Sequence, residues 1–377
     1  MAEKRDHQLV PDNIARLTPY QAGKTIEEVR EAYQPPRISK LASNENRLGF
    51  SPKVDPAVRE ALNEIQDYPD PIARKLRARI ADHNNVTPEN VMVAGGSESI
   101  IAILCRTFFL EDEEILTADA TFVGIYVHAG IQGVPVTRIP LTDDYRYDLE
   151  AMADRITDNT KMVYIANPNN PTGTYITRKE FEAFIERVPD DLIIIMDEAY
   201  WEFARHIDDF PDSLDYRFDN VITLRTFSKA YGLAGFRIGY ALGHDKLISQ
   251  LLKTKLTFEP SALAQAAALA AFEDTTFLNR SIEMVEKGRK RLYAFFEEQG
   301  IEYVRSSSNS VMMILPTEEE AIEFTQAMLE KGIILRRVAA FGLPNCIRIT
   351  VGTDREMEHL EQGIREYRSE EILNENR

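Results

Sequence analysis

The sequence predicts an α/β fold, with a mostly parallel sheet followed by a smaller α+β unit. Five short apolar runs rich in β-branched residues lie at 91–94, 162–166, 192–196, 221–225 and 237–242. Such runs are typical of parallel strands that are buried on both faces. Amphipathic stretches of helical period lie between the runs, which indicates βαβ units. The runs therefore predict one buried parallel sheet covered by helices.

The pattern of residues changes near residue 260. An alanine-rich segment at 261–274 favours a helix, and residues 277–300 predict a long amphipathic helix that ends at Gly300. Residues 301–370 then repeat a strand, helix, strand rhythm. We expect an irregular arm at 1–40, a large domain at 41–272 and a small domain at 273–377. The arm is expected to lack helices because prolines interrupt it, at Pro11, Pro19, Pro35 and Pro36.

Composition narrows the class of protein. The formal net charge is −17, from 61 acidic and 44 basic residues, and an acidic surface repels nucleic acid and anionic membranes. The first residues lack the apolar core of a signal peptide, and the apolar runs are too short to cross a bilayer. Cys105 and Cys346 have neither metal-ligand nor disulfide-framework spacing, so we expect free thiols in a reducing compartment. We expect a cytoplasmic enzyme without a metal, a nucleic-acid partner or a membrane partner.

Polar residues directly follow four of the predicted strands, where ligands collect in open α/β sheets. These residues are Gly95-Gly96-Ser97, the segment 167–173, Asp197 with Tyr200, and Thr226 to Lys229. Each of these segments, taken alone, has an ordinary structural explanation. A Gly-Gly-Ser turn usually only starts a helix, and Asn-Pro-Thr-Gly is a turn. A carboxylate at the end of a buried strand is costly without a cationic partner. Their occurrence together predicts a ligand site that includes an anion cradle.

This combination resembles the fold-type I aminotransferases, which use pyridoxal phosphate (PLP), and in particular the histidinol-phosphate aminotransferase family. The resemblance covers roughly residues 18–365, and the lysine and Asn-Pro-Thr-Gly motifs are its most specific parts. It implies a large domain with a mostly parallel seven-stranded sheet, a smaller α+β domain and a homodimer. The matching segments are 18–24, 41–46, 68–71, 94–100, 167–173, 197–200, 226–240, 332–336 and 347–353.

The resemblance also implies roles around the cofactor ring. Lys229 would form a Schiff base with the cofactor aldehyde and then move the Cα proton of the substrate. Asp197 would pair with the protonated pyridine nitrogen, and Tyr200 and Asn170 would hydrogen-bond the phenolic oxygen of the ring. Phe122 would stack on the ring face.

The remaining implied roles concern the phosphate and the substrate. Backbone N–H groups of Gly96, Ser97 and Glu98 would bind the cofactor phosphate, with the Glu98 side chain pointing away from it. Further phosphate donors would be Thr226, Ser228, Arg237 and Tyr68, the last from the neighbouring subunit. Arg348 would hold the substrate carboxylate in a bidentate fork. Arg336, Tyr20 and Asn44 would lie at the edge of the substrate pocket.

The sequence departs from the family pattern at Arg47 and Ser99, and the loop 336–345 is rather apolar. Several functions therefore stay open. The first is a histidinol-phosphate aminotransferase with glutamate and 2-oxoglutarate as the second pair. The second is an aromatic aminotransferase, with Phe341 and Leu343 lining an apolar pocket. The third is a PLP-dependent decarboxylase of a phosphorylated amino acid. A non-catalytic regulator is disfavoured, because the arm is too short for a DNA-binding module and the net charge is wrong for one.

Overall fold

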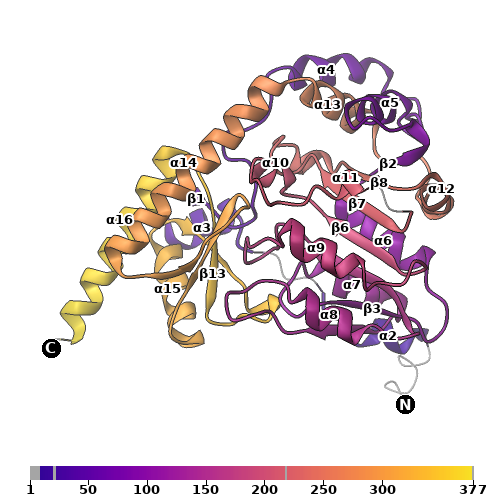
Figure 1. Ribbon diagram of the computed structural model, residues 1–377. Helices are drawn as coiled ribbons and strands as arrows, with labels where there is room; N and C mark the ends of the chain where they lie inside the picture. Colours follow the sequence, from indigo (N-terminus) through magenta and orange to yellow (C-terminus); the bar gives the residue numbers. More distant parts are fainter. Residues whose placement is uncertain (1–8, 20–22, 217–218, 376–377) are drawn as a thin grey trace.

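A computed structural model describes residues 9–19, 23–216 and 219–375 (Figure 1). Its main feature is a seven-stranded sheet of order β2-β8-β7-β6-β5-β3-β4. All its strands run in one direction except β8, which is antiparallel to β2 and β7. The mostly parallel sheet expected from the sequence is thus confirmed. The strands are β2 Val91–Ala94, β3 Glu114–Ala118, β4 Val136–Ile139, β5 Thr160–Ala166, β6 Ile193–Asp197, β7 Val221–Thr226 and β8 Gly239–Leu242.

The direction of β8 corrects one expectation. The run 237–242 is apolar like its neighbours, and we took it for a parallel strand. Only twelve residues separate β7 from β8, and they contain a single short 3-10 turn, Ala234–Phe236. A parallel connection takes a dozen or more residues and usually contains an α-helix that packs on the sheet, whereas this link has no α-helix and reverses the chain. The reversal places the residues just before β8, including Arg237, at the edge where the parallel strands end.

Two strands of the large sheet were not among the five predicted runs. The strand β3 contains Glu114 and Thr117, and β4 lies at the edge of the sheet and is only partly buried.

Helices cover both faces of the sheet (Figure 1). Those of this part are α4 Val54–Ala61, α5 Arg74–His83, α6 Ser97–Thr107, α7 Gly124–Gln132, α8 Leu149–Arg155, α9 Arg178–Ile185, α10 Trp201–Ala204, α11 Ser213–Tyr216, α12 Asp245–Thr254 and α13 Ala262–Phe272.

The C-terminal part forms the expected smaller α+β unit. A four-stranded antiparallel sheet has the order β12-β13-β10-β9, with bounds Arg336–Arg337, Cys346–Thr350, Ser310–Ile314 and Glu302–Val304. The helices are α14 Thr275–Gln299, α15 Glu318–Glu330 and α16 Asp354–Glu375. Gly300 caps α14 in the left-handed conformation, as predicted. Figure 1 shows α14 running from the region of α4 and α13 down to the small sheet.

The N-terminal arm is more regular than expected. It contains α2 Asp12–Ala15 and α3 Ile26–Tyr33, followed by the strand β1 Ser39–Lys40. The helix α3 lies in the proline-free stretch before Pro35, and Thr25 and Glu28 start it with a reciprocal capping box. The strand β1 pairs with β11, Ile333–Ile334, which joins the arm to the C-terminal unit. Within the described ranges, no helix is long and apolar enough to cross a membrane.

Candidate active site

A cavity of about 430 Å³ opens at the edge of the large sheet where the parallel strands end. It gathers residues from six separate segments of the chain. Gly124 keeps one wall open, because a Cβ there would lie 2.4 Å from the ring of Phe122. The predicted cofactor residues that line the cavity are Ser97, Glu98, Phe122, Asn170, Asp197, Tyr200, Thr226, Ser228, Lys229 and Arg237.

Lys229 follows β7 and reaches into this cavity. Its Nζ donates a hydrogen bond to the Ser43 carbonyl oxygen at 3.4 Å and lies 5.6 Å from the centre of the Tyr200 ring. The loop is held just upstream, where the Ser228 N–H donates to the Thr226 hydroxyl at 3.1 Å. The amine therefore faces the cavity from the end of a rigid strand.

Asp197 ends the neighbouring strand β6 and is only 4% exposed. Its carboxylate accepts hydrogen bonds from the Tyr164 hydroxyl at 2.6 Å and the Ala199 N–H at 3.2 Å. Burial raises the pKa of Asp197 to about 6, although the bond from Tyr164 opposes the rise. Among the described residues, Asp197 forms no ion pair. A buried carboxylate in this state favours a cationic ligand beside it.

Asn44 has a different place from the one predicted. Its side-chain amide donates to the Tyr200 hydroxyl at 2.8 Å, and its Oδ1 accepts from the Thr350 hydroxyl at 3.0 Å. The residue is 1% exposed. Asn44 thus lies behind Tyr200 and orients its hydroxyl, instead of lining the edge of the substrate pocket.

The opposite end of the cavity suits an anion. Gly96 has a φ of +97° just before α6, where the first N–H groups of the helix are exposed. A Cβ at Gly96 would lie 3.2 Å from the Arg237 guanidinium, so glycine permits the close approach. The Glu98 carboxylate lies 3.7 Å from Arg237 and 3.9 Å from His128. In this structure the carboxylate thus lies beside the main cation of the cradle, whereas we expect it to point away from a bound phosphate.

The two predicted substrate arginines lie opposite each other on adjacent antiparallel strands, Arg336 on β12 and Arg348 on β13. Arg348 is 5% exposed and donates to the Ala42 carbonyl at 2.8 Å and to the Asn170 side chain. Arg336 forms no ion pair with any described residue, and the backbone of Gly23 lies next to its guanidinium. Tyr20 lies outside the described residues.

Phe341 and Leu343 pack in an apolar cluster of the small unit with Val338 and Cys346, and they do not line the Lys229 cavity. Tyr68 also lies away from this cavity. It is 80% exposed and stacks on Phe258, with the ring centres 4.3 Å apart. Within one chain, Tyr68 therefore has no access to the anion cradle that it was expected to serve.

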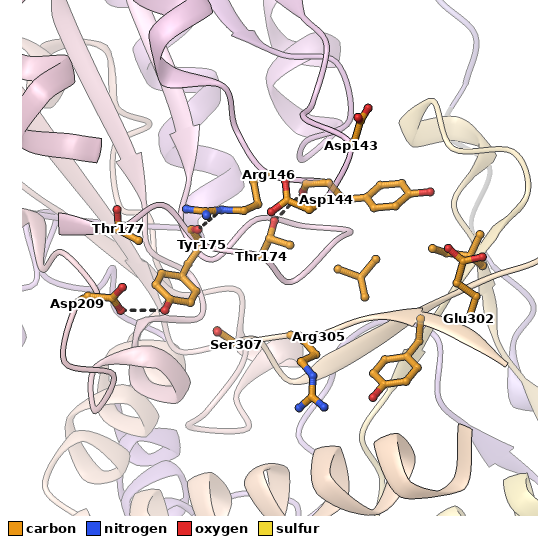
Figure 2. Close-up of a pocket in the computed structure, with 15 residues that line it drawn as sticks. Asp143, Asp144, Arg146, Thr174, Tyr175, Thr177, Asp209, Glu302, Arg305 and Ser307 are labelled. Atoms are coloured by element: carbon orange, nitrogen blue, oxygen red, sulfur yellow. Dashed lines mark hydrogen bonds between the residues drawn. The ribbon is translucent and has the colours of Figure 1, made fainter. Parts of the chain in front are cut away.

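A second cavity, of about 560 Å³, lies between loops of the large sheet and β9. Figure 2 shows Asp209 accepting a hydrogen bond from Tyr175, with Glu302 and Arg305 on the side of the small sheet. This cavity contains no lysine and none of the predicted site residues. The chemistry predicted from the sequence therefore belongs to the Lys229 cavity.

Three residues of the site were missed at the sequence level. Tyr164 lies inside the apolar run of β5 and was taken only as core, although its hydroxyl contacts Asp197. Ser43 and Glu45 line the cavity beside Lys229 but lie far from it in sequence. A polar group within the buried strand β5 was the available signal for Tyr164. Ser43 and Glu45 lie in the matching segment 41–46, from which only Asn44 was given a role.

The sheet, with a lysine after β7 and a buried aspartate ending β6, has the arrangement of the fold-type I enzymes, which use PLP. Comparison with known proteins agrees. The family model of aminotransferase class I and II matches residues 36–364. A histidinol-phosphate aminotransferase of Geobacillus sp. (strain WCH70) is 40% identical over 97% of this chain and 99% of its own length. One from Bacillus velezensis is 38% identical, over 93% and 97%.

Among solved structures, the histidinol-phosphate aminotransferase of Sinorhizobium meliloti, in complex with pyridoxal-5'-phosphate, superposes with a TM-score of 0.86 at 28% identity. The match covers 95% of this chain and 98% of that one. The chain therefore belongs to the class I and II aminotransferases.

Proposed function

We propose that this protein is a PLP-dependent histidinol-phosphate:2-oxoglutarate aminotransferase. The structural observation that supports this choice of substrate is the pair Arg336 and Arg348, which lie opposite each other on β12 and β13. Like charges directly opposite each other on adjacent strands repel, and a bound anion removes that cost. A phosphate dianion offers enough charge and enough oxygens for both guanidinium groups. The names of the relatives that are 38–40% identical over nearly the whole chain support the same substrate.

The cavity fits the cofactor at each of its three polar parts. Asp197, buried without an ion pair among the described residues, would pair with the pyridinium nitrogen, and Tyr200 and Asn170, which line the same cavity, would hydrogen-bond the phenolic oxygen. Phe122 would cover the ring face. The phosphate would be bound by the N–H groups of Gly96, Ser97 and Glu98, together with Thr226, Ser228 and Arg237. A phosphate bound to Arg237 displaces the Glu98 carboxylate, which His128 lies close enough to receive.

The residues of the cavity have separate roles in the proposed reaction. When bound, the cofactor supplies an aldehyde that takes up the amino group and a ring that accepts electrons from the substrate. Lys229 removes the proton from the substrate Cα and returns one to the cofactor side. Asp197 keeps a negative charge beside the ring nitrogen, and Tyr164 fixes its position at 2.6 Å. Asn44 fixes the Tyr200 hydroxyl from behind.

The arginine pair allows two different anions to use one place. Histidinol phosphate has no α-carboxylate, so its phosphate would lie where a carboxylate of glutamate binds in the other half-reaction. Arg348 is the shared anchor, because its planar donors match carboxylate and phosphate alike. Arg336 adds donors that only the phosphate needs.

Arg336→Ala is therefore expected to affect substrates unequally. With histidinol phosphate, kcat/KM should fall by a factor that corresponds to about 1.5–3 kcal/mol, the value of a lost charge-assisted hydrogen bond. With phenylalanine the loss should be much smaller, since Arg348 alone holds its single carboxylate. Steady-state kinetics on both substrates measure this. Arg337→Ala is the matched control, because Arg337 is the next residue of β12 and pairs with Glu318 instead.

The second candidate, an aromatic aminotransferase, predicts equal losses in Arg336→Ala and a wild-type kcat/KM that favours phenylalanine. The decarboxylase alternative predicts release of CO₂ where we expect a 2-oxo product. Phe341, which favoured an aromatic pocket, lies beside the proposed anchor, with the Arg348 guanidinium carbon 5.8 Å from the centre of its ring. The kinetics on both substrates therefore decide between the two functions.

We also propose a two-fold homodimer in which Tyr68 serves the cofactor phosphate of the neighbouring subunit. Tyr68 and Phe258 form an exposed aromatic pair, and Leu62, Ile65 and Leu256 are also about half exposed in the adjoining segments. Exposed apolar residues gathered in this way mark an interaction surface. A closed dimer would bring each Tyr68 to the partner's site.

The assembly prediction is tested by sedimentation at the assay concentration, where the active species should be a dimer. Tyr68→Phe keeps the stacking but lacks the hydroxyl, so it should weaken PLP binding by about tenfold, the value of one strong hydrogen bond, without changing the dimer. A fully active monomer contradicts the proposal.

Two further proposals concern the domain bounds and the cellular location. We place the large domain at 41–272 and the small domain at 273–377, with the arm 1–40 joining the small domain and the dimer interface. Both cysteines are free and buried, which supports a cytoplasmic location.

A further inference from the structure

Glu45 places a fixed charge inside the Lys229 cavity. It lines the cavity together with Ser43 and Lys229. Its Oε1 accepts a hydrogen bond from the Lys40 Nζ at 2.7 Å, and both side chains are about one quarter exposed. Its Oε2 is shielded from water and has no hydrogen-bond partner among the described residues. Lys40 lies on β1, which pairs with β11, so the partner of Glu45 is held by the small unit.

The carboxylate of Glu45 is charged in this setting. Burial acts to raise its pKa, but the hydrogen bond and charge of Lys40, and then the charge of Lys229, leave the pKa below its usual value. The Nζ of Lys229 is at the same time hydrogen-bonded to the Ser43 carbonyl at 3.4 Å. The free amine of Lys229 is therefore held by the Ser43 carbonyl oxygen, and the Glu45 carboxylate lines the same cavity outside ion-pair distance of it.

We propose that Ser43 holds the Lys229 amine when it is not bound to the cofactor, and that Glu45 is a positioning residue whose carboxylate stabilises the protonated form of the Lys229 nitrogen, both as the free amine and when it is linked to the cofactor. This rests on the proposed function. In that reaction the Cα–H bond of the substrate breaks, its electron pair would be taken up by the cofactor ring, and its proton forms a new N–H bond at Nζ. The resulting ammonium is a cation, and the Glu45 carboxylate lowers its free energy.

The other charged groups around the cavity are engaged elsewhere. Asp197 accepts hydrogen bonds from Tyr164 and Ala199, and Glu98 lies beside Arg237 and His128 at the anion end. Tyr200 presents its ring to Lys229 and its hydroxyl to Asn44. Of the three acids that line the cavity, Glu45 is thus the one with a buried oxygen that has no hydrogen-bond partner among the described residues.

The test is a pH titration of the holoenzyme, followed by the absorbance of the bound cofactor, which reports protonation of the nitrogen that links it to Lys229. Glu45→Gln should lower the midpoint by about one pH unit, because a nearby carboxylate favours the protonated, cationic form. The kcat should fall about tenfold, the factor that corresponds to one such unit, with KM changed less than about twofold. Glu45→Asp should recover most of both. Asp55→Asn, which removes an exposed carboxylate paired with Arg59, is the matched control.

An unchanged midpoint in Glu45→Gln overturns the proposal. So does an unchanged midpoint with a KM raised for one substrate only, since Glu45 would then contact that substrate. If Glu45→Gln fails to fold because Lys40 is left alone, the double variant with Lys40→Met removes the pair and should show the same lower midpoint. The titration needs no substrate, so a wild-type enzyme that rejects histidinol phosphate would refute the proposed function and leave this result interpretable.

Discussion

Lys229→Ala is expected to lose at least about 10³-fold in kcat, the scale of removing a nucleophile that also acts as the base. The variant should still bind PLP, because the donors at the anion end and Asp197 are untouched. That binding should be non-covalent, so dialysis removes the cofactor from the variant and not from the wild type. Steady-state kinetics and absorbance after dialysis measure the two effects.

The control for this variant is Lys253→Ala, which removes an exposed lysine of α12 whose amine contacts only Gln250 in the structure. It should keep wild-type turnover and retain its cofactor. A Lys229→Ala enzyme with turnover within tenfold of the wild type would mean that another group moves the Cα proton.

Asp197→Asn is the second large expected effect. The substitution keeps the shape of the side chain and removes the negative charge that would hold the ring nitrogen protonated. Turnover should fall by at least about 100-fold, as for the loss of other preorganised charges in active sites. The thermal midpoint of unfolding should hold or rise, since burying a neutral amide costs less than burying a carboxylate. Asp154→Asn, at a surface ion pair with Arg187, is the matched control.

The same residue gives a pH dependence. In the cofactor-free protein the pKa of Asp197 is about 6, raised by burial. The carboxyl therefore gains a proton as the pH falls through about 6 and loses the charge that attracts the cofactor. PLP affinity, measured by fluorescence titration of the apoenzyme, should decrease over that range in the wild type. In the Asp197→Asn variant, PLP affinity should vary less over the same pH range. A near-wild-type kcat in Asp197→Asn would make Asp197 a structural residue.

Much of this architecture could be predicted because its signals are local. Apolar runs buried on both faces predicted β2, β5, β6 and β7, and the polar residues after them predicted the edge that carries the site. Hydrophobicity carries no information on strand direction, however. The reversal of β8 goes with a connection that contains no α-helix, a feature that the apolar pattern of the strand itself does not show. The helix α3 was not predicted, because the four prolines of the arm suggest an irregular chain throughout. The stretch between Pro19 and Pro35 contains no proline, however, and α3 forms there.

The finer contacts of the site depend on the packing of segments that are distant in sequence. The motif predicted that Asn44 belongs to the site, but only the meeting of residue 44 with residue 200 shows that its amide bonds the Tyr200 hydroxyl. Glu45 lies near Lys229 for the same reason. The position of Tyr68 outside its own cavity also depends on the fold, and its partner depends on a second copy of the chain.

The central claim is that Lys229 carries the cofactor of an aminotransferase. Its most direct test is borohydride reduction of the purified holoenzyme, followed by digestion and mass spectrometry of the labelled peptide. We expect one labelled peptide with the cofactor fixed on Lys229, and loss of the label when the amino donor is added before reduction. A label on any other lysine would contradict it.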